Sequence, residues 1–241
     1  MKTIFRAIDD RSRHFQEHPL FSLLRGSEVA AERKLDIVPP LAHFVMTFAD
    51  IYVSVLRDEP TNDPLQRIVN AHTREDGHHW KWYLADLDKL RCNPRLSFGD
   101  SLRFLWSEHL LRTRLVSYEI CRMGIEAAPI ERLAIVLCIE ATGAVTLRNL
   151  APVGDEVARR SGVTLTYFGS HHLNTENDHT LEQDEVRREL DGMTLEPAVS
   201  ARLMAIVDRV FASFTSGADD LLDHLRNPGR FPRAAPESRA G

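Results

Sequence analysis

The pattern of apolar and polar positions along the chain is helical almost throughout. Apolar residues recur at helical spacing, and the alternation typical of strands is nearly absent. Prolines and glycines mark the expected boundaries, since Pro favours the first turn of a helix and Gly follows helix ends. The pattern predicts helices over residues 1–17, 40–56, 64–91, 98–123, 129–150, 153–161, 163–181 and 197–225.

These helices predict one all-α domain over residues 1–226, a bundle of seven or eight helices. No internal repeat and no linker divides the chain. The C-terminal segment NPGRFPRAAPESRAG holds three prolines and has no periodicity. We therefore expect residues 227–241 to be a disordered tail.

Composition and charge exclude several classes of protein. Apolar residues make up 43% of the chain and charged residues 27%, as in ordinary globular proteins. The formal net charge is −5 and no long run of Lys or Arg occurs, which argues against a nucleic-acid partner. The N-terminus lacks an apolar signal region and no transmembrane span is expected, so we expect a cytoplasmic protein. The three cysteines form no CxxC pair and predict no disulfide framework.

Histidine is the residue type that points to chemistry. The chain has 11 histidines, and six of them fall within residues 72–79 and 171–179. On a continuous helix, His72 and His79 share the face that carries the apolar residues, Glu75 and Asp76 flank it, and His78 points toward its edge. Burying these groups is unfavourable unless they are paired, hydrogen-bonded or bound to a metal. A hydrogen-bonded polar pair between helices is the alternative.

The second window has the spacing His-x3-Glu-x2-His. Steps of four and three residues place His172, Glu176 and His179 on one helical face, while His171 points away from it. Two imidazoles and a carboxylate at this spacing suit a first-row transition metal. An exposed polar face is the alternative, because the residues between these three are also polar.

One acidic residue, Glu140, lies inside an apolar run. It shares a helical face with Val136 and Ala144, and no Lys or Arg occurs within six residues of it. An isolated ionised carboxylate is unfavourable there, whereas a metal ion would neutralise it. A protonated Glu bonded to a backbone carbonyl is the alternative. Gly143 leaves room for a close helix or a ligand.

Together the three segments offer three histidines and up to three carboxylates. Oxygen and nitrogen ligands without sulfur suit iron or manganese, with two ions expected. A ferritin-like site is one template, and it would take its ligands from Asp50, Glu75, His78, Glu140, Glu176 and His179. That template leaves His79 and His172 unexplained.

The order and spacing of these residues resemble the heme-oxygenase-like diiron oxidases and oxygenases. In that family a carboxylate and a His on one core helix are followed by a lone Glu on a later helix, and then by His-x3-(Asp/Glu)-x2-His. Here the pattern falls on Glu75, His79, Glu140, His172, Glu176 and His179. The segment GHHWKWYLADLDKL, which begins at Gly77, is also similar to the corresponding sequence of family members.

Two features depart from the family pattern. The carboxylate between the last two histidines is more often Asp than Glu, and the position of the first carboxylate varies. The position of the first carboxylate therefore corresponds to Asp76 or Glu75, or else to His72, which would then be an additional or supporting ligand. His78 could also take the place of His79. The resemblance covers about residues 40–225.

The resemblance implies an all-α heme-oxygenase-like fold that binds two ferrous ions and uses dioxygen as co-substrate. It implies oxidation of a small molecule, an amino acid (aromatic ones included) or a fatty acid, in natural-product biosynthesis. The known outcomes are N-oxygenation, C–C cleavage, desaturation and nitrile formation. In this pattern Glu140 holds or bridges the irons, the histidines fix the geometry and Glu176 shifts between binding modes.

An apolar pocket is expected beside the metals, and its candidate lining residues are Phe48, Tyr83, Tyr167 and Phe168. We expect a small-molecule partner, no nucleic acid and no membrane, and a homodimer is compatible with the fold. Two other functions remain open on the same fold. One is haem binding through an axial His14 or His18, and the other is a metal-free hydrolase or partner-binding module.

Overall fold

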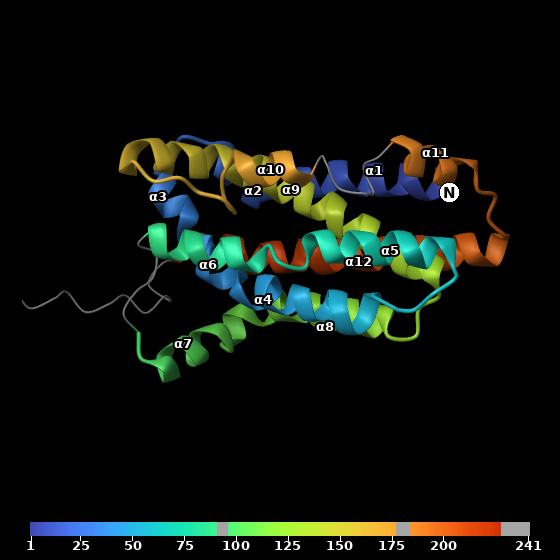
Figure 1. The fold of residues 1–241 in the computed structure, drawn as a ribbon. Coiled ribbons are helices and arrows are strands. Elements are labelled where there is room, and N and C mark those ends of the chain that lie inside the picture. The colour runs from blue at the N-terminus through green and yellow to red at the C-terminus, as the bar shows by residue number, and fades with distance from the viewer. Residues whose placement is uncertain (91–95, 177–183, 228–241) are drawn as a thin grey trace, which may run out of the picture.

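The computed structural model describes residues 1–90, 96–176 and 184–227, and within them all regular structure is helical (Figure 1). The all-α prediction is therefore confirmed, and the helices form a single body. The α-helices are α1 (Lys2–Gln16), α2 (Pro19–Arg25), α3 (Ala31–Lys34), α4 (Ala42–Ile51), α5 (Pro64–Asp76), α6 (Trp80–Lys89), α7 (Phe98–Leu105), α8 (Leu111–Gly124), α9 (Pro129–Ser161), α10 (Ser170–Glu176), α11 (Asp184–Gly192) and α12 (Pro197–Arg226).

Four shorter helical segments join them. Three are 3-10 turns, η1 (Leu35–Ile37), η2 (Pro39–Leu41) and η4 (Glu108–Leu110), and η3 (Tyr52–Leu56) is π-helical. The number of helices exceeds the expected seven or eight because two predicted helices are broken and several short ones were not predicted. Of the expected tail over residues 227–241, only Asn227 is described, as the residue that ends α12, and residues 228–241 lie outside the described residues.

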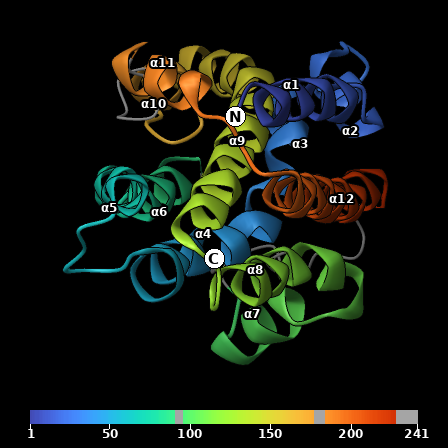
Figure 2. The same cartoon turned by 90° about the vertical axis from the view of Figure 1, so that its right-hand side faces the viewer.

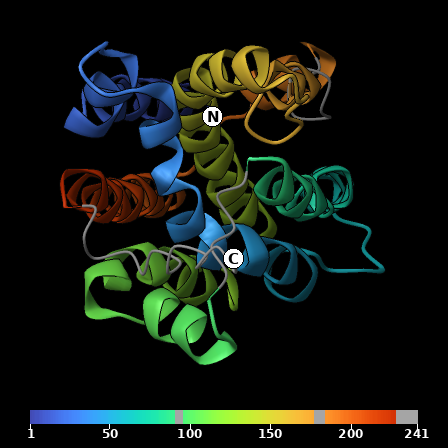
Figure 3. The same cartoon turned by 90° about the vertical axis from the view of Figure 1, so that its left-hand side faces the viewer.

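Helix α9 runs through the middle of the body. In Figure 2 it crosses the molecule with α5 and α6 on one side and α12 on the other, and Figure 3 shows the same arrangement from behind. Its sequence explains this position, since the run from Leu133 to Ile139 is buried without interruption. A helix that is apolar on all sides over two turns has to be surrounded by other elements.

The predicted helix over residues 64–91 is broken in the middle. Helix α5 ends at Asp76, a three-residue turn follows, and α6 begins at Trp80. The guanidinium of Arg57 donates to the carbonyl oxygen of Thr73 at 2.7 Å, and the continuing helix would use that carbonyl as its acceptor. Gly77 sits at this point, where an added Cβ would lie 2.9 Å from the same oxygen. The expectation of one straight helix is therefore wrong.

The predicted helix over residues 98–123 is also broken, between α7 and α8. The guanidinium of Arg114 donates to the carbonyl oxygens of Leu105 and Ser107, both at 2.8 Å. These bonds satisfy carbonyls that lose their helical partners at the break.

Pro152 does not end its helix, contrary to expectation. Helix α9 continues through it to Ser161, so the predicted separate helix over 153–161 is part of α9. Pro152 cannot donate to the carbonyl of Arg148, but its neighbours Leu150, Ala151 and Val153 are buried on the core side. Packing on both sides of the proline holds the helix together across the missing hydrogen bond.

Residues 163–169 form a loop rather than the start of the predicted helix over 163–181. The loop lies directly against α9 at Gly154, where an added Cβ would be 1.9 Å from the carbonyl oxygen of Phe168. The helical part begins at Ser170 as α10. Residues 177–181 of the predicted helix lie outside the described residues.

One segment, Ala31–Leu56, is long and apolar enough to cross a membrane by length and composition. In the structure 39% of its most apolar window is buried inside the body. Core helices of soluble proteins and signal sequences share this composition, so the expectation of no transmembrane span stays a prediction. Cys121 and Cys138 are free thiols, and Cys92 lies outside the described residues.

Candidate metal centre

Three acidic and imidazole side chains meet where α5 crosses α9. One ligand atom each of His72, Asp76 and Glu140 lies within 4.8 Å of the other two. His72 and Asp76 are one turn apart at the end of α5, and Glu140 comes from the buried middle of α9. Nε2 of His72 is 3.0 Å from Oε1 of Glu140. The His72 side chain is fully buried, and that of Glu140 is 19% exposed.

Tyr52 closes one side of this group. Its hydroxyl donates to Oε1 of Glu140 at 3.3 Å and lies 3.3 Å from Nε2 of His72. Tyr52 is the first residue of the π-helical segment η3 and is completely buried. Single π-helical turns are common at functional sites because they shift a side chain out of the regular helical register.

His79 and His172 extend the group. Nδ1 of His79 lies 2.5 Å from Oδ1 of Asp76 and 3.1 Å from Nε2 of His172. Both imidazoles are buried. Helix α10 therefore brings a third histidine against the two helices that supply the other residues, although His172 is 93 positions from His79 in the sequence.

The orientation of His172 is typical of a metal ligand. Its Nδ1 donates to the carbonyl oxygen of Tyr167 at 3.1 Å, which leaves the lone pair of Nε2 facing His79 when the ring is neutral. Histidines that bind metals usually donate their second ring nitrogen to a carbonyl or a carboxylate in this way.

The donor set fits a divalent metal. Oδ1 of Asp76 is buried and accepts no hydrogen bond within the described residues, and its near neighbour is Nδ1 of His79 at 2.5 Å, which can pair with it only when His79 is protonated. A buried carboxylate oxygen in that state is unfavourable, whereas a cation would satisfy it. Two carboxylates and three imidazoles without a thiolate are ligands that iron and manganese accept.

Asp86 positions the loop that precedes α10. This carboxylate is completely buried and accepts hydrogen bonds from the backbone N–H groups of Thr166, Tyr167 and Phe168 at 2.9, 2.7 and 3.0 Å. These three bonds place the Tyr167 carbonyl that orients His172. Sequence reasoning missed this role, and the only signal was an acidic residue on the apolar face of its helix.

Trp82 covers the outer side of His79. Their rings are stacked with centroids 4.2 Å apart and an interplanar angle of 19°. His78 and His171 contact the same indole edge-on, and both are exposed. The prediction that these two histidines point away from the site is confirmed.

The structure brings together four of the predicted site residues, His72, His79, Glu140 and His172. The neighbouring carboxylate is Asp76, while Glu75 is only half-buried and does not belong to the three-residue group. The side chain of Glu176 and all of His179 lie outside the described residues. Their assignment stays a prediction.

The structure gives the alternative sites less support. The ferritin-like template uses His78 and Asp50, which are both exposed. Of the two histidines considered for haem, His14 is exposed, and His18 uses both ring nitrogens in the protein. Nδ1 of His18 accepts from the N–H of Leu20 at 3.2 Å, and Nε2 lies 3.1 Å from Asp219.

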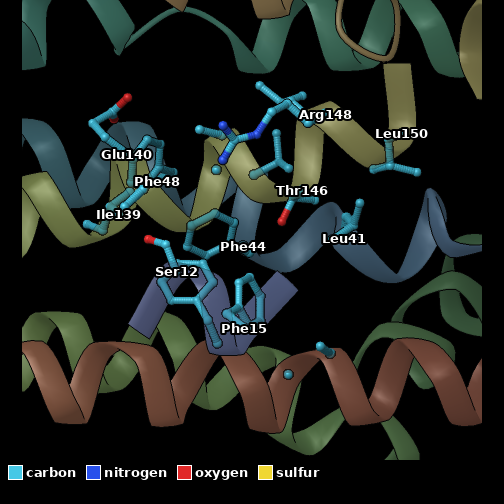
Figure 4. A pocket seen from close by; sticks show the side chains of 18 of the residues that line it. Ser12, Phe15, Leu41, Phe44, Phe48, Ile139, Glu140, Thr146, Arg148 and Leu150 are labelled. Atoms are coloured by element: carbon cyan, nitrogen blue, oxygen red, sulfur yellow. The ribbon is translucent and has the colours of Figure 1, made fainter. Parts of the chain in front are cut away.

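A cavity of about 800 Å³ lies beside the centre. Asp76, His79, Glu140 and His172 form part of its wall. Figure 4 shows its apolar part, in which Phe44 and Phe48 of α4 face the α9 segment that carries Glu140. Phe48, Tyr167 and Phe168 line the cavity as expected. Tyr83 does not line it, since its ring is buried in the core and its hydroxyl donates to the carbonyl of Val38 at 2.9 Å.

Neither a scan against protein-family models nor a search of curated proteins finds a match to this chain.

Proposed function

We propose that the protein is a dioxygen-dependent non-heme diiron oxidase or oxygenase that acts on a small organic substrate. The observation that carries the proposal is the buried group of His72, Asp76 and Glu140. Asp76 and Glu140 line a large, mostly apolar cavity, and His79 and His172 line it beside them. The resemblance of the motif order to the heme-oxygenase-like diiron enzymes supports the same assignment.

The residues divide into two kinds by charge. Asp76 and Glu140 would neutralise the metal charge, and His72, His79 and His172 would supply neutral nitrogen donors. Glu176 and His179, the other two residues of the His-x3-Glu-x2-His motif, would complete the ligand set. When bound, the two ferrous ions would supply the electrons with which dioxygen is activated.

The surrounding residues hold these donors in place. The Tyr167 carbonyl fixes the ring orientation of His172, and Tyr52 holds one oxygen of Glu140. Supporting bonds of this kind raise metal affinity because the ligands need no reordering on binding. The apolar walls on the Phe44 and Phe48 side would keep water away from the reacting substrate.

Metal analysis of the full chain tests the proposal. After anaerobic reconstitution with ferrous iron we expect about two irons per chain, as in other bundle-core dimetal sites. Exposure to dioxygen should then give a transient visible absorption band. Glu140→Ala and His172→Ala should each lose most of the bound iron.

His171→Ala is the matched control, because this residue is next in sequence, is exposed and should keep its iron. Circular dichroism and thermal unfolding of each variant separate a lost ligand from a lost fold. If folded Glu140→Ala and folded His172→Ala both retain the parent iron content, the proposed function is wrong.

A further inference from the structure

Most of the large apolar side chains that stay exposed within the described residues gather at one end of the body. They lie on α4, α7 and α8, and the turn η4 joins the last two. Figures 2 and 3 show α7 and α8 at the lower end of the molecule, opposite α10 and α11. A large apolar face that is open to water is typical of a protein–protein interface.

Helix α8 carries an exposed apolar stripe in addition to its buried face. Leu111, Leu115 and Tyr118 are 44%, 41% and 51% exposed. Steps of four and three residues separate them, which is the spacing of the a and d positions that form the seam of a coiled coil. The other face of the same helix, with Val116 and Ile120, is buried in the core. The exposed stripe therefore lies outside the core of its own chain.

Charged residues of opposite sign continue the stripe at its two ends. Glu108 precedes Leu115 by seven residues, Arg122 follows it by seven, and both side chains are exposed. Arg122 also donates to Glu119 of its own helix at 2.8 Å. If a second α8 packs antiparallel with Leu115 at the centre, Glu108 of each copy lies beside Arg122 of the other. The stripe is thus complementary to itself, as the contact surface of a two-fold dimer has to be.

Aromatic residues widen this face. Trp106 and Tyr118 pack edge-on against the buried His43, each with its ring centroid 5.6 Å from that of the histidine. Phe98 of α7 is 80% exposed. Because a whole aromatic side chain offers about 150–250 Å², these three exposed rings present about 400 Å² to solvent. That is about half of the ~800 Å² that each partner buries in a stable interface, and the leucines of α7 and α8 add to it.

We propose that two copies of this chain associate through this face, with their α8 helices antiparallel and Leu115 at the two-fold axis. Burial of the apolar stripe favours the association, and the pairs of Glu108 with Arg122 select the antiparallel register. A parallel pairing would place like charges opposite each other at both ends of the stripe, which is unfavourable. The inference does not rest on the proposed function, because the face contains none of the candidate metal ligands.

Sedimentation velocity of the full chain tests the inference. The parent should sediment as a dimer, at twice the chain mass of 27.4 kDa. Leu115→Glu should weaken dimerisation at least about 100-fold, because it places two like charges together at the axis. Leu84→Glu is the matched control, since Leu84 is a similarly exposed leucine on α6. It should dimerise like the parent, and circular dichroism shows that each variant is folded.

Exchange of the two charges tests the register. Glu108→Arg alone and Arg122→Glu alone should each weaken the dimer about 10-fold, since each change turns two attractive pairs into repulsive ones. The double variant restores opposite charges at both ends and should regain most of the parent affinity. A double variant that dimerises no better than the single variants would overturn the antiparallel register.

A cysteine at the axis tests the geometry directly. In the antiparallel pair residue 115 of one copy faces residue 115 of the other, so Leu115→Cys should give a disulfide-linked dimer on mild oxidation. Leu84→Cys and the parent chain should stay single chains on a non-reducing gel. Equal cross-linking of Leu115→Cys and Leu84→Cys would contradict the proposed axis.

A parent chain that sediments as a monomer would overturn the inference and leave the face to a different partner protein. A dimer that persists unchanged in folded Leu115→Glu would also overturn it. Iron content measured on the same samples keeps the two proposals apart. An iron-loaded monomer would contradict only the dimer, and a dimer that takes up no iron would contradict only the diiron assignment.

Discussion

At the scale of single residues, the choice between Glu75 and Asp76 shows what the sequence could and could not decide. The two carboxylates are adjacent, and on a straight helix both flank the face that carries His72. The turn at Gly77 brings His79 back against Asp76, whose Oδ1 is then 2.5 Å from Nδ1 of His79. Helical periodicity cannot predict this contact between Asp76 and His79, because the contact depends on the break in the helix.

The first prediction compares these neighbours directly. Asp76→Asn should weaken ferrous iron binding by at least about 100-fold, because loss of even a supporting residue around a metal typically lowers affinity 10- to 100-fold. Glu75→Gln should bind iron within a few-fold of the parent. Anaerobic titration with ferrous iron measures both affinities. A larger loss for Glu75→Gln than for Asp76→Asn would return Glu75 to the ligand set.

Tyr52 is a site residue that could not be identified from the sequence. It lies in the apolar run of the segment 40–56, where an aromatic residue indicates core packing. Its contacts to His72 and Glu140 arise because the helix widens into a π-helical turn at this residue. Nothing in the local pattern predicts that turn.

At the scale of elements, the predictions succeeded where periodicity is long and failed where a side chain from elsewhere intervenes. The last helix, expected over 197–225, is observed as Pro197–Arg226. At the break after α5, Arg57 from outside the helix binds the carbonyl of Thr73. At the break after α7, Arg114 of α8 binds the carbonyls of Leu105 and Ser107, which lie only nine and seven residues before it. In α9 the opposite error occurs: a helix end is predicted at Pro152, but the buried residues on both sides of the proline keep the helix continuous. Such tertiary effects lie outside any local sequence window.

Asp86 supplies the second prediction at this scale. Asp86→Asn should lower the free energy of unfolding by about 3 kcal/mol, because an amide oxygen cannot serve three N–H donors as a carboxylate does and the amide N–H₂ repels them. Urea unfolding measures the change. Asp88→Asn, an exposed acidic residue on the same helix, should change stability by less than about 0.5 kcal/mol.

Asp86→Asn should also lower iron affinity, since the loop that it holds carries the Tyr167 carbonyl. A variant with parent stability and parent iron content would show that the loop does not depend on these bonds.

At the scale of the whole molecule, stability should depend on pH through a histidine that does not belong to the candidate centre. Burial, with smaller effects from His109 and Arg33, lowers the pKa of His224 to about 4. His224 on α12 is 2% exposed, and its ring lies parallel to that of His109. The imidazole of His224 is therefore neutral in the folded state.

The sign of the effect follows from this lowered pKa. In the unfolded chain the same imidazole takes up a proton near pH 6.5, so its stabilising contribution is complete above that pH and is lost as the pH falls from about 6.5 to 4. The loss amounts to about 3 kcal/mol over the whole range. His224→Gln should make the stability less dependent on pH in this window, as measured by urea unfolding at several pH values. An unchanged dependence would contradict the assignment to His224.

The candidate centre joins parts of the chain that are far apart in sequence. Glu140 is 68 residues from His72, and His172 is 93 residues from His79. Contacts of this separation form late in folding, because a long loop must close before they stabilise the chain. During synthesis the site cannot exist until residue 172 has left the ribosome and α10 has docked. If the proposed function is right, nascent chains that end before residue 172 should therefore not take up iron at this site, because they lack part of the ligand set.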